Sequence, residues 1–245
     1  MHSKVWGKYL WWLLHTITYS FDEKYDQELT QKYVEIFYAL PKVIPCPICR
    51  SHYKKRLAYA PVEKYLSSKD KFRSWLIDIH NNVNRGLGKP TISLSYANSL
   101  YLNKDNSLKY NYQNFIILIR MLSMVNQKFI DIKAVRKLIR LSFDVLMNYG
   151  SLKNAPYSYE NIKMINNQND MNKWIVEFDI EYMKNNNRKP YLKLNNKSNV
   201  VDYHELAKKL EPKKLEPKKL NEIKPIENKK DDKKKSKPDQ KKPKK

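Results

Sequence analysis

The stretch Pro45-Cys46-Pro47-Ile48-Cys49-Arg50 contains the only two cysteines in the 245-residue chain. Two cysteines separated by two residues are typical of a redox dithiol or of half a zinc site, and the spacing can also arise by chance. Proline is tolerated in the first helical turn, so the stretch predicts a helix start. Cys46 would then lie at a helix N-terminus, where unpaired N–H groups and the macrodipole favour a thiolate.

Apolar residues recur at helical spacing on both sides of the cysteine pair and predict an all-α fold. We expect a bundle of four helices followed by a short fifth, with Pro41 ending the second helix and Pro61 the third. The expected helices cover residues 3–20, 26–40, the cysteine pair to Tyr59, about 70–87, and 94–102. On this spacing, Trp11 shares a helix face with His15, and His80 shares one with Asn84.

Polarity rises after residue 102, and further helical patterns without cysteine, histidine or glycine-rich loops follow. We therefore expect a domain at residues 1–102, a linker at 103–111 and a helical accessory domain at 112–190. Residues 191–245 are a Lys/Pro-rich, low-complexity tail that buries too little apolar surface to fold, so we expect disorder there.

The chain is strongly basic, with a formal net charge of +23. Residues 205–245 contain 17 lysines against 8 acidic residues and so contribute +9 of that charge. The tail is therefore a candidate contact for nucleic acid or an anionic membrane, although the composition resembles an AT-rich coding bias. The short apolar run at residues 10–14 lacks a cleavage site, and no stretch reaches a membrane span, so we expect a cytoplasmic protein.

The residues alone leave three readings of the cysteine pair open. Zinc would need further ligands such as His52 with His80 or His15, but no second pair has finger-like spacing. A thioredoxin-like site would need a β-strand before Cys46, where the pattern predicts helix. A helical bundle holding an aromatic, phosphate-bearing cofactor is the third reading, although buried tryptophans and histidines are also ordinary core residues.

Four motifs in order resemble the Erv/ALR family of FAD-linked sulfhydryl oxidases. They are the segments GKYLWWLLHT at residues 7–16, PCPIC at 45–49, FRSWL at 72–76 and HNNVNRGLGKP at 80–90. The resemblance covers about residues 4–102. The AT-rich composition, the lack of further cysteines and the added C-terminal region are similar to those of enzymes of large DNA viruses, mimivirus-like ones above all.

The resemblance implies a four-helix bundle that cradles FAD, with Cys46 and Cys49 as the catalytic pair. Cys46 would be the exposed cysteine that exchanges with substrate thiols, and Cys49 would pass electrons to FAD and then to O2, producing H2O2. The residues implied to contact the cofactor are Gly7, Lys8, Trp11, His15, Trp75, His80, Asn81, Asn84, Leu87, Gly88, Lys89 and Tyr101. No metal is expected.

The chain departs from the family pattern in two places. It lacks the second, shuttle CxxC of many members, so protein thiols must reach Cys46 directly or through a thioredoxin-like relay protein. Ile77 stands where many relatives have a cysteine, and Leu94 stands near the position of its partner. The fifth helix must therefore be held by apolar packing alone.

The resemblance also implies a homodimer through the Trp-rich first helix and a role in a viral disulfide-formation pathway, in host cytoplasm, viral factory or virion. The rival hypothesis from another class is a non-enzymatic helical binding module whose basic tail contacts nucleic acid or membrane.

Overall fold

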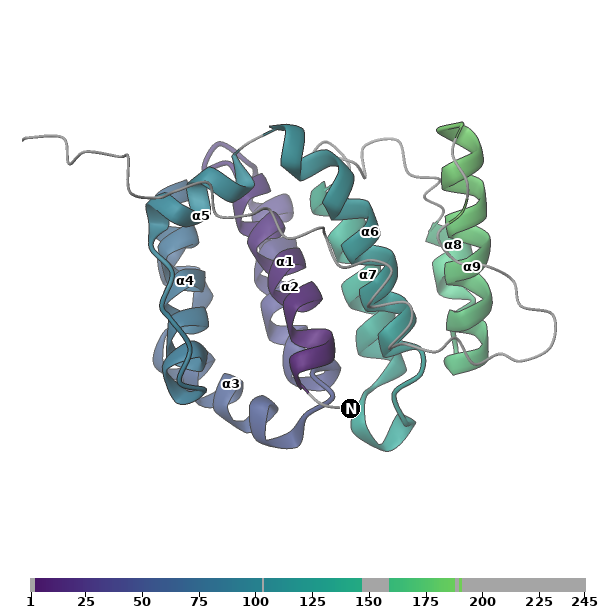
Figure 1. Ribbon diagram of the computed structural model, residues 1–245, viewed down its shortest axis with the longest axis horizontal. Coiled ribbons are helices and arrows are strands. Elements are labelled where there is room, and N and C mark those ends of the chain that lie inside the picture. The colour runs from purple at the N-terminus through teal and green to yellow at the C-terminus, as the bar shows by residue number, and fades with distance from the viewer. Residues whose placement is uncertain (1–2, 103, 147–158, 188–189, 191–245) are drawn as a thin grey trace, which may run out of the picture. The chain divides into compact units, whose positions relative to one another are not determined.

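The computed structural model describes residues 3–102, 104–146, 159–187 and 190 (Figure 1). This part of the chain contains helices and no strand, which confirms the all-α prediction. The expected disordered tail lies outside the described residues. The α-helices are α1 (Ser3–Ser20), α2 (Gln27–Val43), α3 (Pro47–Tyr59), α4 (Lys69–Gly86), α5 (Leu94–Tyr101), α6 (Lys104–Leu122), α7 (Ile132–Leu146), α8 (Tyr159–Lys163) and α9 (Gln168–Asn185), with 3-10 turns η1 (Val62–Tyr65) and η2 (Gln127–Phe129).

Side-chain caps explain where several helices begin. The side chains of Asp26, Cys46, Ser68 and Ser93 each accept a hydrogen bond from a backbone N–H in the first turn of α2, α3, α4 and α5, respectively. Each cap satisfies one of the donors that a helix N-terminus leaves unpaired. The redox pair therefore begins its helix in the same way as the ordinary caps.

The prediction that Pro41 ends the second helix is wrong, because α2 continues through it to Val43. Proline has no N–H, so Pro41 leaves the carbonyl of Phe37 without its usual helical donor. The hydroxyl of Tyr53 on α3 donates to that carbonyl at 3.1 Å. This bond compensates for the proline and fixes α3 against α2.

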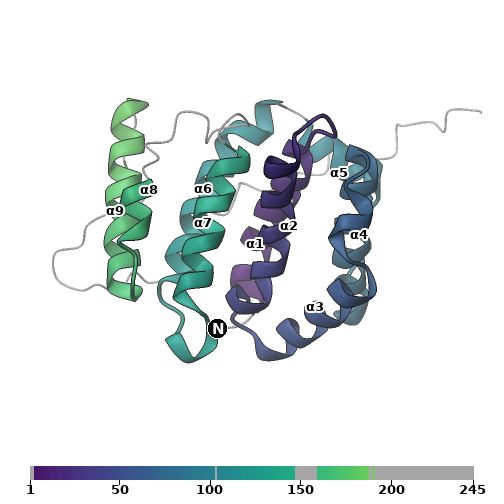
Figure 2. The same ribbon diagram turned by 180° about the vertical axis from the view of Figure 1, so that it is seen from behind.

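α1 lies at the centre of the fold. It packs against α4 and α5 on one side and against α6 and α7 on the other, and both views show α1 and α2 between these groups (Figures 1 and 2). Every described side chain from Leu13 to Ser20 is buried, and Lys8 is the only exposed one among those described in α1. A helix buried all round is a core element rather than a surface helix.

The structure differs from the expected linker at residues 103–111, because α6 begins at Lys104. The segment is polar but contains neither glycine nor proline, and polarity alone does not end a helix. Contacts group Met1–Leu194 into one compact unit, with no break near residue 102.

The helices after residue 103 pack onto the first part of the chain. α7 buries ten side chains and makes its most extensive contact with α2. Two ion pairs also join α2 and α7. Lys137 Nζ lies 2.8 Å from Glu35 Oε2, and Lys32 Nζ lies 3.8 Å from Asp144 Oδ2. The helical patterns expected between residues 112 and 190 are present as α7 and α9, whereas the five-residue α8 is too short to give a periodic signal.

Among the described helices, none is both long and apolar enough to cross a membrane.

Candidate functional site

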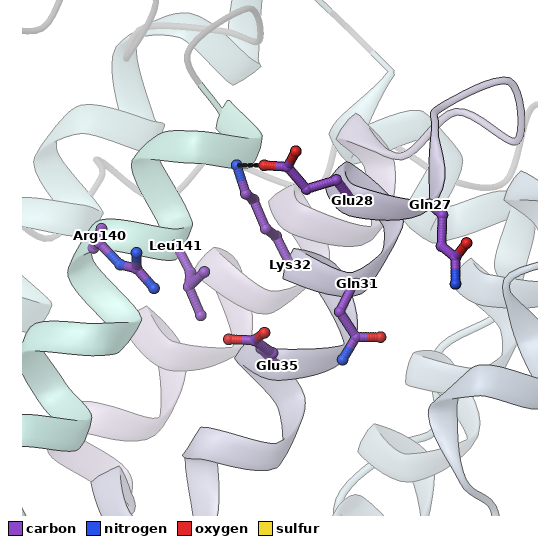
Figure 3. A pocket seen from close by; sticks show the side chains of 7 residues that line it. All are labelled: Gln27, Glu28, Gln31, Lys32, Glu35, Arg140 and Leu141. Atoms are coloured by element: carbon purple, nitrogen blue, oxygen red, sulfur yellow. Dashed lines mark ion pairs between the residues drawn. The ribbon is translucent and has the colours of Figure 1, made fainter.

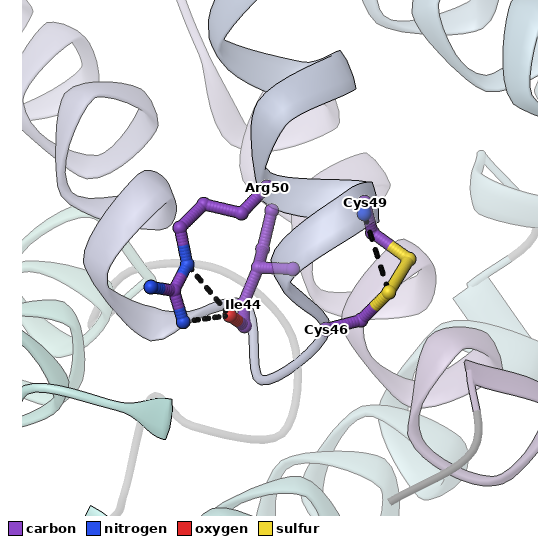
Figure 4. The surroundings of a disulfide bond; sticks show 4 residues. All are labelled: Ile44, Cys46, Cys49 and Arg50. Carbon is purple, nitrogen blue, oxygen red and sulfur yellow. Dashed lines mark hydrogen bonds between the residues drawn. A yellow bond between two sulfur atoms is a disulfide. The ribbon is translucent and has the colours of Figure 1, made fainter. Parts of the chain in front are cut away.

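Cys46 and Cys49 form a disulfide at the start of α3, with their Cα atoms 5.2 Å apart (Figure 4). Cys46 is the N-cap, and its Sγ accepts a hydrogen bond from the N–H of Cys49 at 3.2 Å. A thiolate at this sulfur would be stabilised by that N–H and by the helix dipole. Both cysteines are half-buried, so burial alone does not identify which one meets a substrate.

Arg50 holds the loop that leads into the redox pair. Its guanidinium donates to the carbonyl of Ile44 at 3.0 and 3.3 Å and also to the carbonyl of Phe129 in η2. Figure 4 shows this side chain on the opposite side of the helical turn from the disulfide. A second bond joins the same segments, from the N–H of Asp131 to the carbonyl of Lys42 at 2.9 Å. The segment before α7 therefore lies against the redox loop.

A cluster of four aromatic rings lies between α1, α4 and α5. Trp11 and His80 stack with ring centroids 4.0 Å apart at 7°, and Tyr101 stacks on His15 at 5.1 Å. His15 Nε2 and His80 Nδ1 are hydrogen-bonded at 3.0 Å. Residues from three helices thus form one ring cluster, and Trp11 and His15 contribute to it from one face of α1.

Burial keeps both histidines neutral. It lowers the pKa of His15 from 6.5 to about 3, with a further contribution from His80. Burial also lowers the pKa of His80 from 6.5 to about 4, and the nearby charge of Lys89 lowers it further. The Nδ1 of His15 is buried and has no hydrogen-bond partner among the described residues. A buried polar atom without a partner requires an explanation, and a bound ligand would supply the missing contact.

The turn after α4 is held by two asparagines of the expected site. The side-chain amide of Asn81 donates to the carbonyl of Ile92 and accepts from its N–H, both at 2.8 Å. The side chain of Asn84 donates to the carbonyl of Pro90 at 3.0 Å. Gly88 has φ of 64°, which other residues rarely adopt, so the turn requires glycine there. These asparagines therefore shape the turn that carries Lys89.

Apolar packing and hydrogen bonds hold α5 in place. Buried Ile77 packs in one cluster with Tyr101 and half-buried Leu94, so apolar contact replaces the disulfide at these positions. The expectation of apolar packing alone is wrong, because the hydroxyl of Tyr19 also donates to Asn98 at 2.6 Å. The Asn81–Ile92 bonds add to this anchoring.

Eight of the expected cofactor residues are not part of the four-ring cluster, among them Gly7, Lys8, Trp75 and Leu87. Lys8 is exposed at the edge of α1, Leu87 is exposed just after α4, and at Gly7 an added Cβ would meet no atom within 4 Å. Trp75 is buried, packs on Phe37 and Phe72, and donates its indole N–H to Ala60. These contacts are those of a core residue, so a cofactor contact for Trp75 stays a prediction.

Two alternative readings find no support. No group of three or more His, Cys, Asp or Glu residues in the described segments is arranged to hold a metal ion. The segment before Cys46 is helix α2 and not the β-strand that a thioredoxin-like site requires. The hollow between α2 and α7 is lined mainly by polar and charged side chains and contains no thiol or aromatic ring (Figure 3).

Sequence reasoning missed two arginines around this site. Arg50 sits in the first turn of α3, where the helix dipole disfavours a cation, and that conflict is the available signal for a specific partner. Buried Arg73 lies over the ring of Tyr19, with 4.4 Å between the guanidinium carbon and the ring centroid. Arg73 also pairs with Asp70 three residues earlier, but its contact with Tyr19 joins distant parts of the sequence, so no local pattern predicts that contact.

The described part of the chain combines an all-α fold, a CxxC disulfide at a helix N-terminus and a partly buried cluster of four rings. Comparisons with known proteins show which family the first part of the chain matches. The Erv1 / Alr family matches residues 8–105. No solved structure gives a significant match.

Three relatives show the extent of the similarity. The "FAD-linked sulfhydryl oxidase ERV1" of Oryza sativa subsp. japonica is 33% identical over 99 residues, which are 40% of this chain and 50% of that protein. The "Probable FAD-linked sulfhydryl oxidase R368" of Acanthamoeba polyphaga mimivirus is 32% identical over 98 residues, 40% of this chain and 68% of that protein. The "FAD-linked sulfhydryl oxidase" of African swine fever virus (isolate Tick/Malawi/Lil 20-1/1983) is 31% identical over 114 residues, 45% of this chain and 92% of that protein.

The chain belongs to the Erv1/Alr family. It spans about half the length of the plant relatives that it matches. The predicted family resemblance is thus confirmed for the first part of the chain, and the matches leave most of α6–α9 uncovered.

Proposed function

We propose that the protein is an FAD-dependent thiol oxidase that forms disulfides in protein substrates and transfers the electrons to O2. The observation that carries this proposal is a dithiol at a helix N-terminus in the same fold as a buried, neutral ring cluster. The names of the relatives, which are all FAD-linked sulfhydryl oxidases, support the same function. Overall, two thiols and O2 would give one disulfide and H2O2.

The ring cluster fits the chemistry of FAD. Stacked rings suit a planar aromatic ligand, and the unpartnered Nδ1 of His15 is a free polar contact. The ligand's phosphates need cations, and Lys89 on the turn after α4 and Lys8 at the edge of α1 are both exposed. When bound, FAD would accept two electrons from the reduced cysteine pair and deliver them to O2.

Asn81 and Asn84 have a positioning role in this proposal. Their side chains are occupied by backbone bonds to Ile92 and Pro90. They would set the turn that contains Gly88 and Lys89, and Leu87 and Tyr101 would border the ligand from α4 and α5. Gly7 would leave room for a close approach to α1.

The redox pair performs the thiol chemistry. A substrate thiolate attacks Cys46 Sγ, the Cys46–Cys49 bond breaks, and Cys49 leaves as a thiolate. A second substrate thiolate then attacks the substrate sulfur of the mixed disulfide and releases Cys46 as a thiolate. The N–H of Cys49, which already donates to Cys46 Sγ, stabilises that leaving group. The reduced pair carries two electrons and returns to the disulfide when they are withdrawn.

Protein thiols are the proposed substrates, reached directly or through a thioredoxin-like relay protein. Viral relatives among the matches support a role in viral disulfide formation. The homodimer through α1 stays a prediction with little surface available, because α6 packs on α1 and Lys8 is its only exposed described side chain. Sedimentation of the purified protein tests it.

Visible absorbance and oxygen uptake test the proposal. The purified protein should show flavin absorbance and consume O2 when dithiothreitol is added. Cys49→Ser should abolish turnover while FAD stays bound, because the pair can no longer cycle. A folded protein without flavin would contradict the proposal and favour the rival binding module.

A further inference from the structure

The surface around the redox pair is built jointly by α3 and by the helices added after residue 103. The backbone bond from Asp131 to Lys42 and the side-chain bonds of Arg50 to Ile44 and Phe129 place η2 and the start of α7 against the loop that leads into the redox pair. Exposed apolar side chains stand on both parts, with Ile48 69% exposed between the two cysteines and Phe129 41% exposed in η2. Both parts therefore present an apolar side chain beside the start of α3, with Ile48 between the cysteines and Phe129 next to Arg50.

Basic side chains surround these apolar residues. Residues 42–62 contain five Lys or Arg and no Asp or Glu. Of these, Lys42, Lys54, Lys55 and Arg56 are exposed, and Lys128 is exposed in η2. Lys54 stands four residues after Arg50, and Lys55 stands seven residues after Ile48. Each lysine therefore shares a face of α3 with a residue next to the cysteines. At 1.5 Å per residue, these two lysines lie about 8–9 Å beyond Cys49 along the helix.

The charges of this surface are not compensated within the described parts of the chain. None of Lys42, Lys54, Lys55 and Lys128 forms an ion pair there, whereas lysines on other elements do, such as Lys137 with Glu35. The nearby carboxylate of Asp131 is occupied, because it accepts the backbone N–H groups of Lys133 and Ala134 at the start of α7. Uncompensated cations of one sign steer an oppositely charged partner.

We propose that this surface, defined by Ile48, Phe129, Lys42, Lys54, Lys55 and Lys128, docks an acidic protein that presents a dithiol to Cys46. The inference rests on the proposed thiol oxidase function and adds the charge class of its substrate. Acidic protein is favoured over nucleic acid because the partner must supply thiols, which nucleic acids lack. The segment around η2 thus takes part in substrate recognition, which gives the added helices a role.

Two dithiol peptides of equal length test the proposal, one flanked by four glutamates and the other by four lysines. The full-length protein should oxidise the glutamate peptide with a kcat/KM about tenfold higher at low ionic strength, because steering raises the rate of encounter. The ratio should fall toward one at high salt, where charges are screened within a few ångströms.

The double variant Lys54→Glu, Lys55→Glu should invert the preference, and Lys128→Glu should reduce it. The matched control is Lys173→Glu, Lys184→Glu on α9, a helix that lies beyond α6 and α7 from α3 in both views (Figures 1 and 2). The control should retain the wild-type ratio. Circular dichroism and flavin content show that each variant is folded.

Oxidation of dithiothreitol, which needs no docking surface, distinguishes a failure of substrate docking from a failure of the oxidase function. A wild-type protein that oxidises dithiothreitol but does not prefer the glutamate peptide would overturn the docking proposal alone. A preference that survives the Lys54, Lys55 reversal would also overturn it. A wild-type protein that cannot oxidise dithiothreitol would remove the proposed function and this inference together.

Discussion

The two parts of the chain, residues 3–102 and helices α6–α9, use the same helical packing for different ends. The first part departs from ordinary folding rules at two places of the site: a buried His15 nitrogen without a partner among the described residues, and the cation Arg50 in a first helical turn. Departures of this kind concentrate at functional sites.

The second part is mainly apolar packing, with two departures of its own: Ser142 Oγ is buried without a hydrogen-bond partner among the described residues, and Asn187 has φ of 52°. α7 presents an apolar face to α2, and the buried carboxylate of Asp179 accepts a hydrogen bond from Tyr112 at 3.0 Å. The comparison teaches that the added helices supply packing to the part that carries the chemistry. They are integrated with the core, since α1 and α2 pack against both parts.

Truncation after residue 102 should have the largest effect on the stability of the first part. The loss of α6 and α7 exposes the apolar faces of α1 and α2, and the penalty should approach the total stability of a domain, roughly 5–15 kcal/mol. We expect loss of the cooperative thermal transition in circular dichroism. A chain truncated after residue 194, the end of the compact unit, is the control and should keep that transition. A stable, cooperative 1–102 fragment would show two independent domains.

Matched core substitutions sharpen the same point. Leu40 on α2 and Leu138 on α7 are both fully buried, so Leu40→Ala and Leu138→Ala should each cost about 3 kcal/mol. Because the two helices pack on each other, each variant should shift one common unfolding transition in urea. Two transitions, each sensitive to only one of the substitutions, would contradict a shared core.

The ring cluster should make stability depend on pH. The pKa of His15 is about 3 in the folded protein against 6.5 as its ordinary value. Below pH 6.5 the unfolded state therefore binds more protons, so stability falls as pH falls. Between pH 7 and pH 5, His15 alone should account for about 2 kcal/mol.

His15→Phe should flatten this pH dependence in urea unfolding measured at pH 5, 6 and 7, whatever its effect on absolute stability. His52→Gln on the exposed face of α3 is the matched control and should leave the slope unchanged. An equal slope in wild type and His15→Phe would show that His15 is not held neutral.

Much of the first part could be predicted from sequence, since its helices have strong periodicity and its site residues form specific motifs. The stacking of Trp11 on His80 was not predicted, because it joins side chains of two different helices. The course of α2 through Pro41 was not predictable, because the compensating donor is Tyr53 on another helix. Likewise, no local pattern shows that α6 and α7 cover α1 and α2, or that Arg50 reaches Phe129.

The most direct test of the central claim is an anaerobic reduction of the purified flavoprotein by dithiothreitol, followed by visible absorbance. If Cys46 and Cys49 carry electrons to a flavin held by the ring cluster, wild-type flavin should bleach while Cys49→Ser keeps its bound flavin oxidised. Equal bleaching in both proteins would show that electrons reach the flavin without the pair and would contradict the account.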